Sequence, residues 1–155
     1  MINDIVVSQI RDVEVLMQWR MEVLHCVFSI PTNADTTSLE QANRRYYERH
    51  LPDGSHIACI AFVNGEMAGS GGVCLQEEMP SPDNPCGRCA YLMNIYVRPD
   101  YRGCGVARRI VRWLVGHALA QGISKIYLET SDVARKLYAD LGFGYMKDMM
   151  KLKTI

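Results

Sequence analysis

The strongest constraint in this chain is a glycine-containing turn between an apolar run and an amphipathic run. The apolar run Tyr91–Val97 is typical of a buried strand, and Gly103 and Gly105 stand where the next helix begins. The first N–H groups of a helix have no partner inside the helix, and the helix dipole places positive charge there. Because glycine has no Cβ, a ligand can approach its backbone closely. The segment therefore predicts a strand, an anion-binding turn and a helix that together hold a phosphate or pyrophosphate.

Two common phosphate-binding motifs do not fit the residues of this turn. A Walker loop needs Gly-Lys followed by Ser or Thr, whereas Gly105 is followed by Val106 and Ala107. A dinucleotide-binding turn needs a third glycine, and Arg108 stands at that position. The pattern that remains is Arg102-x-x-Gly105-x-Ala107.

This pattern resembles the acyl-CoA pyrophosphate signature of the Gcn5-related N-acetyltransferase (GNAT) family, which is Arg/Gln-x-x-Gly-x-Gly/Ala. A second motif of the same family, Asn-x-x-Ala-x-x-Leu-Tyr-x-x-x-Gly-Phe, follows a strand. Downstream of the strand-like run Lys125–Thr130, the matching residues are Ala134, Leu137, Tyr138, Gly142 and Phe143, with Ser131 in place of Asn. Because the two motifs occur in the right order and spacing, the chain is identified as a member of this family.

Length, charge and composition predict one soluble domain. The 155 residues are a usual size for a single domain, so we expect one N-acetyltransferase domain over residues 1–155. Seventeen basic residues balance seventeen acidic ones, which argues against a nucleic-acid-binding domain. The first residues do not resemble a signal peptide, and no apolar run approaches the length of about 18 residues that a membrane span needs. We therefore expect a cytoplasmic protein with no nucleic-acid or membrane partner.

The six cysteines do not form a recognisable metal site. Cys86 and Cys89 form a CxxC pair, but a zinc site needs two further ligands at suitable spacing, and no second CxxC or paired histidine exists. Without a secretory signal we expect reduced thiols and no bound metal.

Periodicity and turn signals predict strands and helices in the order β-α-α-β-β-β-α-β-α-β(β). The expected strands are Ile5–Ile10, His56–Val63, Met67–Leu75, Ala90–Val97 and Lys125–Thr130, with one or two more in Phe143–Leu152. The expected helices cover residues 12–28, 37–51, 105–120 and 132–141. This is the element order of the GNAT family. The resemblance implies an α/β (α+β) fold with a mixed, mostly antiparallel six- or seven-stranded sheet flanked by helices.

The resemblance also implies the reaction, which is acetyl transfer from acetyl-CoA to a primary amine of a small molecule or peptide. In the family the fourth and fifth strands splay apart, and the acyl-CoA enters the gap. Tyr138 matches the family's general-acid tyrosine, and a phenol with a pKa near about 10 stays protonated at neutral pH. The alternative role for Tyr138 is packing in the core. Ser131 either forms a hydrogen bond with the CoA arm or caps the next helix.

Backbone groups near the turn are the candidates to hold acetyl-CoA. Unpaired backbone groups of Asn94 to Val97 are the candidates for the pantetheine arm and the oxyanion, and those of Ile95, Tyr96 and Val97 are favoured. The N–H groups expected to bind the pyrophosphate are those of Arg102, Gly103, Cys104, Gly105, Val106 and Ala107. The Arg102 side chain is expected to add positive charge, and Cys104 to contribute only its backbone.

The residues leave the general base and the acceptor open. Many family members place a glutamate on the fourth strand, whereas Ala90–Val97 contains no acid. The candidates for the base are Glu22, His25, Glu77, Glu78 and Glu129, together with removal of the proton through water. The side chains that can line an acceptor pocket are Trp19, Arg20, Leu24, Tyr46 and Tyr47, with Trp19 and Leu24 expected in the core.

Two further points stay open at this stage. A non-catalytic module that senses CoA or acyl-CoA is the alternative function, because the acid on the fourth strand is missing. A homodimer is common in the family, but the sequence shows no interface.

Overall fold

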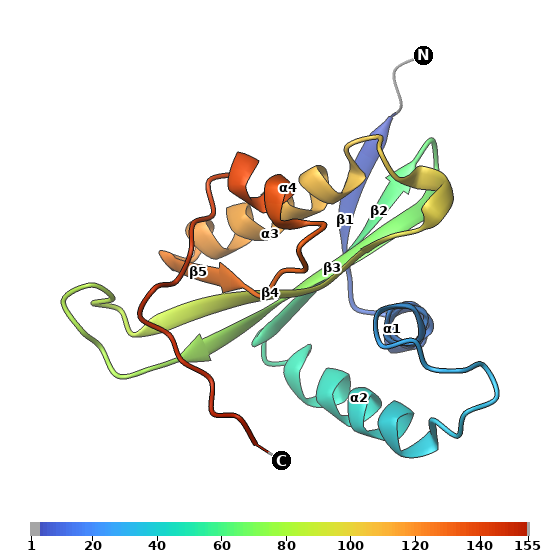
Figure 1. The fold of residues 1–155 in the computed structure, drawn as a ribbon, viewed down its shortest axis with the longest axis horizontal. Coiled ribbons are helices and arrows are strands. Elements are labelled where there is room, and N and C mark those ends of the chain that lie inside the picture. Colours follow the sequence, from blue (N-terminus) through green and yellow to red (C-terminus); the bar gives the residue numbers. More distant parts are fainter. Residues whose placement is uncertain (1–3, 155) are drawn as a thin grey trace.

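The computed structural model describes residues 4–154 and shows a five-stranded sheet with helices on both faces (Figure 1). The strands are β1 (Ile5–Ile10), β2 (His56–Val63), β3 (Glu66–Glu77), β4 (Arg88–Val97) and β5 (Lys125–Leu128). The helices are α1 (Val13–Val27), α2 (Thr37–His50), α3 (Val106–Ala120) and α4 (Arg135–Asp140), with a short 3-10 turn, η1 (Pro99–Tyr101). Strands β1 to β4 pair antiparallel in chain order, and β5 pairs parallel to β4. The predicted mixed, mostly antiparallel sheet is confirmed.

Helix α3 covers one face of the sheet and forms the larger core with it. Ile110 and Leu114 on α3 are fully buried against the strands. The helix comes this close because β3 carries Gly71 at the contact, where a Cβ would lie 2.5 Å from Ile110 Cγ2. Helix α4 lies on the same face (Figure 1). An ion pair joins Arg108 of α3 to Asp140 of α4.

Helices α1 and α2 lie on the opposite face (Figure 1). The Asp12 side chain caps α1 by accepting hydrogen bonds from the N–H groups of Glu14 and Val15, as acidic and amide side chains at this position commonly do. The smaller core on this face consists of Leu16, Met17, Tyr47, Leu51 and Ala58. The sheet is therefore buried on both sides, and β2 is buried along nearly its whole length.

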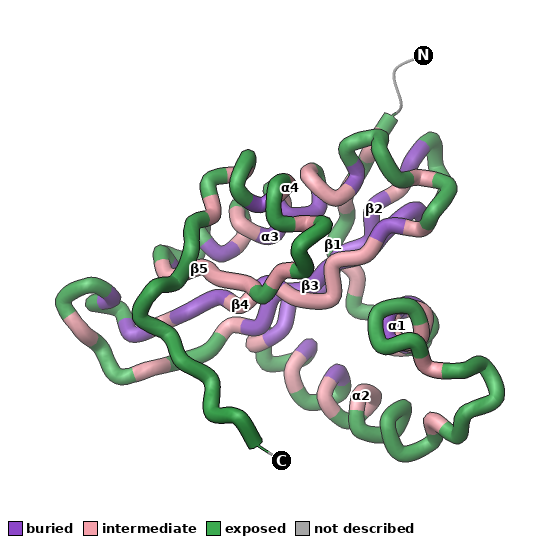
Figure 2. The backbone as a smooth tube through the Cα atoms, viewed as in Figure 1, coloured by how far each residue is buried: buried purple, intermediate pink, exposed green. Residues whose placement is uncertain are grey.

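The prediction of one or two further strands in Phe143–Leu152 is wrong. Residues 143–154 form no strand in the structure, so the described sheet has five strands rather than six or seven. The segment runs past β5 as an exposed coil (Figures 1 and 2). Its apolar residues favour a strand only where a neighbouring strand pairs with them, because β-propensity reflects packing against such neighbours. The edge strand β5 offers four residues, all only partly buried.

The loop between β3 and β4 is held by the buried Asn84, which donates to Glu78 Oε1 at 2.8 Å and to the Arg88 carbonyl at 3.1 Å. Cys86 of this loop is exposed and Cys89 is buried, and neither forms a disulfide. Among residues 4–154, no three His, Cys, Asp or Glu side chains gather as a metal site, and no helix has the length and apolarity to cross a membrane.

Candidate active site

The predicted turn joins β4 to α3, and its backbone has the shape that glycine permits. Gly103 and Gly105 have φ angles of +76° and +86°, in the left-handed region, and Gly105 is the N-cap of α3. A Cβ added at either position would meet no atom within 4 Å, so the space beside the turn is open. No side chain caps α3, and its first turn carries no acidic residue. The first N–H groups of α3 are therefore available to an anion.

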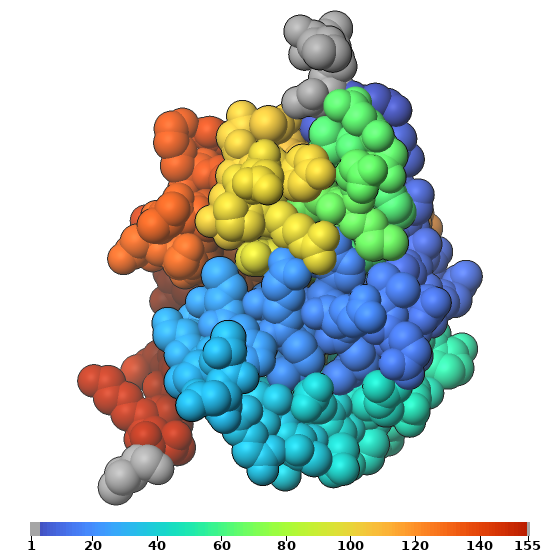
Figure 3. Space-filling view, turned by 90° about the vertical axis from the view of Figure 1, so that its right-hand side faces the viewer, coloured from blue at the N-terminus to red at the C-terminus, as the bar shows by residue number. Residues whose placement is uncertain are grey.

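The basic side chains near the turn have definite positions. Arg102 is exposed, and its Nε donates a hydrogen bond to the Val97 carbonyl at 2.9 Å, which ties the turn back to the end of β4. Arg98 forms an ion pair with Glu22 of α1 at 3.0 Å and lies over the Trp19 ring. The turn thus lies on the surface directly beside α1 (Figure 3).

The pairing between β4 and β5 stops before β4 ends. They pair only from Cys89↔Lys125 to Leu92↔Leu128, whereas β4 continues to Val97. Within the described chain, the predicted donor-binding residues 95–97 therefore have no partner in β5. The pairing with β3 is also irregular here, and Asn94 has a φ angle of +59°. The end of the β4–β5 pairing agrees with the gap that the family resemblance implies at this position, and residues 95–97 lead from it into the turn.

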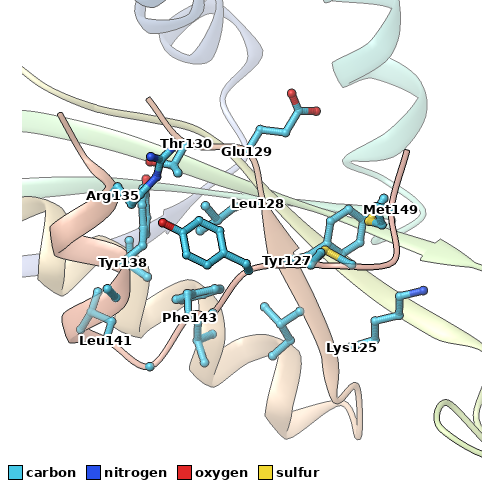
Figure 4. A pocket seen from close by; sticks show the side chains of 18 of the residues that line it. Lys125, Tyr127, Leu128, Glu129, Thr130, Arg135, Tyr138, Leu141, Phe143 and Met149 are labelled. Carbon is cyan, nitrogen blue, oxygen red and sulfur yellow. The ribbon is translucent and has the colours of Figure 1, made fainter. Parts of the chain in front are cut away.

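Tyr138 lies on α4, buried to 9% exposure with its ring edge against Phe143. Burial raises the pKa of its phenol above the ordinary value, so the hydroxyl keeps its proton at neutral pH. The side chain borders a cavity of about 1400 Å³ between α3, β5, α4 and the C-terminal segment (Figure 4). None of residues 102–107 lines this cavity, so the structure does not bring Tyr138 and the turn into one pocket.

Ser131 lies in the exposed turn before α4. Its Oγ accepts a hydrogen bond from the Ala134 N–H at 3.4 Å. This contact lies within the turn itself, since the N-cap of α4 is Ala134 and the described residues provide no side-chain cap for this helix, so both predicted roles of Ser131 stay predictions. The helix itself begins at Arg135, later than predicted.

A second, smaller cavity of about 240 Å³ lies on the opposite face of the sheet. The residues that line it are Arg20, Ala42, Asn43, Tyr46, Tyr47, His56, Cys74, Met93 and Asn94. Three of the predicted acceptor-pocket residues are among them. Trp19 and Leu24 are instead buried in the core, with 3% and 4% exposure, as expected.

A chain of neutral polar groups forms one wall of this smaller cavity. The Tyr46 hydroxyl lies 2.9 Å from His56 Nδ1 and 2.9 Å from Cys74 Sγ. His56 is 4% exposed, and burial lowers its pKa to about 4, so the ring is uncharged at pH 7. Burial also raises the pKa values of Tyr46 and Cys74. His56 Nε2 is buried without a hydrogen-bond partner among the described residues.

The model of the Acetyltransferase (GNAT) family matches residues 16–143 of the chain, which include most of α1 and the whole turn. The chain belongs to the GNAT family. This confirms the family that the two motifs indicated.

Individual relatives agree with this membership. Glucosamine 6-phosphate N-acetyltransferase 1 of Oryza sativa subsp. japonica is 29% identical over 107 residues, which are 67% of this chain and 63% of the rice protein. Thialysine N-epsilon-acetyltransferase of Sus scrofa is 33% identical over 91 residues, which are 44% of this chain and 54% of the pig protein. The aligned regions thus span only part of each relative.

A solved structure matches almost the whole GNAT chain. It is a protein from Clostridium acetobutylicum described as a predicted acetyltransferase with acetyl-CoA, and it superposes with a TM-score of 0.82. The two chains are 25% identical, and the match covers 97% of this chain and 96% of the other.

Most candidates for the general base of this GNAT protein are occupied by other contacts. Each forms a hydrogen bond of 2.9 to 3.3 Å with another group of the protein. Glu22 bonds with Arg98 and Glu78 with Lys125, while Glu129 bonds with Tyr91 and His25 with the Ile30 carbonyl. The Lys125 contact lowers the pKa of Glu78 below its ordinary value, which weakens it as a base. Glu77 is exposed at the end of β3. The structure therefore favours none of the five.

Sequence reasoning missed three residues of the smaller cavity that come from the sheet, His56, Cys74 and Met93, and it considered Asn94 only for its backbone. One signal was visible, because His56 is the only strongly polar residue of an otherwise apolar strand. The position of Asn94 has no sequence signal, since it depends on the irregular pairing between β3 and β4.

Proposed function

We propose that this GNAT protein transfers the acetyl group of acetyl-CoA to a primary amine of a small molecule or peptide, by direct attack of the amine on the thioester. The observation that carries the proposal is the position of Asn94. Its side chain lines the smaller cavity, and the residues that follow it lead along the part of β4 that has no described partner in β5 to the start of α3. A donor held by β4 and the turn and an acceptor in the cavity meet at this segment.

The turn fits the pyrophosphate of acetyl-CoA. Its glycines leave open space, its helix start is uncapped, and Arg102 adds a positive charge at the end of β4. Backbone N–H groups at a helix start are a suitable partner for such an anion. The related Clostridium acetobutylicum protein, with acetyl-CoA in its structure, supports the same donor. When bound, acetyl-CoA supplies the activated acetyl group as a thioester.

Tyr138 is proposed as the general acid that protonates the departing thiolate. Its raised pKa supports this role, because the group must carry its proton at the pH at which the reaction runs. The role is assigned to Tyr138 because this residue, Gly142 and Phe143 match the family motif.

The acceptor is proposed to be a small molecule rather than a long peptide. The smaller cavity, at about 240 Å³, has the volume of about eight water molecules. The rice and pig relatives are named for glucosamine 6-phosphate and thialysine, which are both small primary amines. A small amine of this kind matches the size of the cavity.

The test combines donor binding with turnover. Acetyl-CoA at about 100 times its dissociation constant should raise the free energy of unfolding by about 2.7 kcal/mol, which a thermal-shift titration detects. Release of CoA is then measured over a panel of primary amines. Tyr138→Phe should lower kcat on the order of 100-fold while the dissociation constant of acetyl-CoA stays unchanged. Tyr145→Phe is the matched control, because Tyr145 borders the same cavity but is exposed.

The outcomes separate the alternatives. Stabilisation by acetyl-CoA without turnover of any amine supports a non-catalytic sensor module. Turnover with an unchanged kcat in Tyr138→Phe assigns that tyrosine to the core. The absence of stabilisation by either acetyl-CoA or CoA contradicts the role of the turn.

A further inference from the structure

Among the described residues, Arg20 is the one charged residue that lines the smaller cavity. The other lining side chains are apolar or uncharged at pH 7, and this includes His56, whose pKa is lowered to about 4. Arg20 extends from α1 and is half-buried, while its neighbours in the cavity come from α2, β2, β3 and β4. The electrostatic character of this cavity is therefore set by a single guanidinium.

Two amide oxygens hold the Arg20 guanidinium in place. Arg20 Nε donates to Asn43 Oδ1 at 2.9 Å, and Arg20 NH1 donates to Asn94 Oδ1 at 2.9 Å. These bonds orient the group without neutralising it, because amide oxygens carry no net charge. Within residues 4–154 the NH2 nitrogen has no hydrogen-bond partner, and a guanidinium fixed in this way presents N–H groups that match a carboxylate or phosphate.

Neighbouring arginines have carboxylate partners, and Arg20 does not. Arg44 of α2 pairs with Glu14, and Arg98 pairs with Glu22, each across to α1. No carboxylate lies within ion-pair distance of Arg20 in the described part of the chain. A charge that is partly removed from water is costly without a counter-ion. A bound anion would remove this cost.

We propose that the acceptor amine also carries an anionic group, a carboxylate or a phosphate, and that Arg20 binds it in the cavity between α1, α2 and β4. The inference rests on the proposed function and adds the substrate class to it. With its anion at Arg20, the acceptor directs its amine toward Met93 and Asn94, where the cavity reaches the free end of β4. The small volume of the cavity keeps the anion and the amine a few bonds apart.

A purely structural role for Arg20 is the competing explanation, because its two hydrogen bonds connect α1 to α2 and β4. The two explanations differ in what happens when an anion is added. If Arg20 has only a structural role, added inorganic anions should not bind near it. If Arg20 binds anions, the binding should be saturable and should depend on the positive charge of Arg20.

The first experiment measures anion binding directly. Inorganic phosphate and, separately, acetate are titrated into the protein with CoA present at saturation, so that the turn is already filled. The NMR signals of the Arg20 Nε–H and of the Asn43 and Asn94 side-chain amides are followed. We expect saturable shifts in the wild type, and an apparent affinity at least about tenfold weaker in Arg20→Met. Arg45→Met is the matched control, since Arg45 is exposed on α2 and does not line the cavity.

The second experiment compares acceptors in matched pairs. Phosphoethanolamine is set against ethanolamine, and γ-aminobutyrate against butylamine, with acetyl-CoA as the donor. We expect kcat/KM to be at least about tenfold higher for one or both anionic members, with most of the difference in KM. The pair with the larger ratio tells a phosphate-bearing from a carboxylate-bearing acceptor. Arg20→Met should abolish the ratio, and Arg45→Met should preserve it.

Asn43→Asp provides a second test that does not depend on whether Arg20→Met folds. The substitution keeps the size of the side chain and places a carboxylate on Arg20 Nε, so the guanidinium stays in position but acquires an internal counter-ion. The only described bond it removes is an exposed one from Asn43 Nδ2 to the Leu39 carbonyl within α2. We expect an unchanged melting temperature, with both the anion shifts and the anionic preference reduced.

Three results would overturn the inference. They are equal anion affinity in Arg20→Met and wild type, equal use of neutral and anionic acceptors, and a full anionic preference in Asn43→Asp. Failure of acetyl-CoA to bind or react overturns the proposed function instead. In that case the phosphate and acetate titrations still report on Arg20.

Discussion

The turn before α3 and the cavity beneath α1 and α2 are built in opposite ways. The turn uses consecutive residues, and the groups proposed to bind acetyl-CoA are backbone N–H groups in a turn whose left-handed backbone depends on Gly103 and Gly105. The cavity uses side chains from five elements that lie far apart in the chain, such as Arg20 and Asn94. The difference explains why a local sequence pattern predicts the proposed donor site but not the proposed acceptor site.

The two regions also differ in their electrostatics. Residues 102–105 of the turn are exposed, so solvent screens the charges there. The cavity contains a buried histidine, a buried cysteine and a half-buried arginine, and burial moves the pKa values of the first two. Substitutions in the turn should therefore change mainly ligand binding, and substitutions in the cavity should change both stability and selectivity.

The largest expected effect is an acid-dependent loss of stability caused by the cavity. The pKa of His56 is about 4 in the folded protein and 6.5 in an unperturbed histidine, so the unfolded chain binds the proton more readily. The free energy of unfolding has its full value above pH 6.5 and falls by about 3 kcal/mol as the pH drops to 4. Urea unfolding at several pH values measures this fall. His56→Gln should remove it, and His117→Gln, on the other face of the sheet, should retain it.

A smaller effect tests how tertiary packing positions the turn. A Cβ at Gly71 would lie 2.5 Å from Ile110 Cγ2 and 3.1 Å from Leu114 Cδ1, so Gly71→Ala forces α3 away from β3. We expect a loss of about 2 kcal/mol in the free energy of unfolding, measured by urea titration. Gly116 lies on α3, and a Cβ added there would meet no atom within 4 Å. Gly116→Ala should therefore raise the free energy of unfolding by about 0.5 to 1 kcal/mol. A neutral Gly71→Ala would show that α3 does not pack as tightly as described.

The smallest effect separates backbone strain from ligand binding at the turn. Gly105→Ala should lower the free energy of unfolding by about 1 kcal/mol, because alanine resists the left-handed backbone at a φ of +86°. Gly54→Ala carries a similar strain at +76° in a turn before β2 and is the matched control. Only Gly105→Ala should weaken acetyl-CoA binding, measured by calorimetric titration. An equal affinity in both variants would contradict the role of the turn.

Much of the fold could be predicted because its signals are local. The bounds of Ile5–Ile10 and His56–Val63 agree with prediction, since alternation and turn residues mark these strands directly. The start of α1 follows from the capping side chain of Asp12. The last predicted strands fail, because residues 143–152 have the composition of a strand but no pairing partner among the described residues.

The candidate site likewise has features that local motifs predict and features that depend on tertiary contacts. The motifs around Gly105 and Tyr138 sufficed for the family, which the profile match confirms, whereas the roles of individual site residues stay predictions. Glu22 illustrates the limit of reasoning from residue type. It was a candidate base from its chemistry alone, yet the fold places it against Arg98 in an ion pair.

By itself, the sequence determined most of the elements, the family and the glycine-containing turn before α3, because each depends on residues a few positions apart. Only the tertiary structure decided that Arg20 faces a cavity without a carboxylate partner among the described residues, held by Asn43 and Asn94. The physical reason is that the energy of a charged side chain depends on what surrounds it in space. Those surroundings arise only when distant segments pack together.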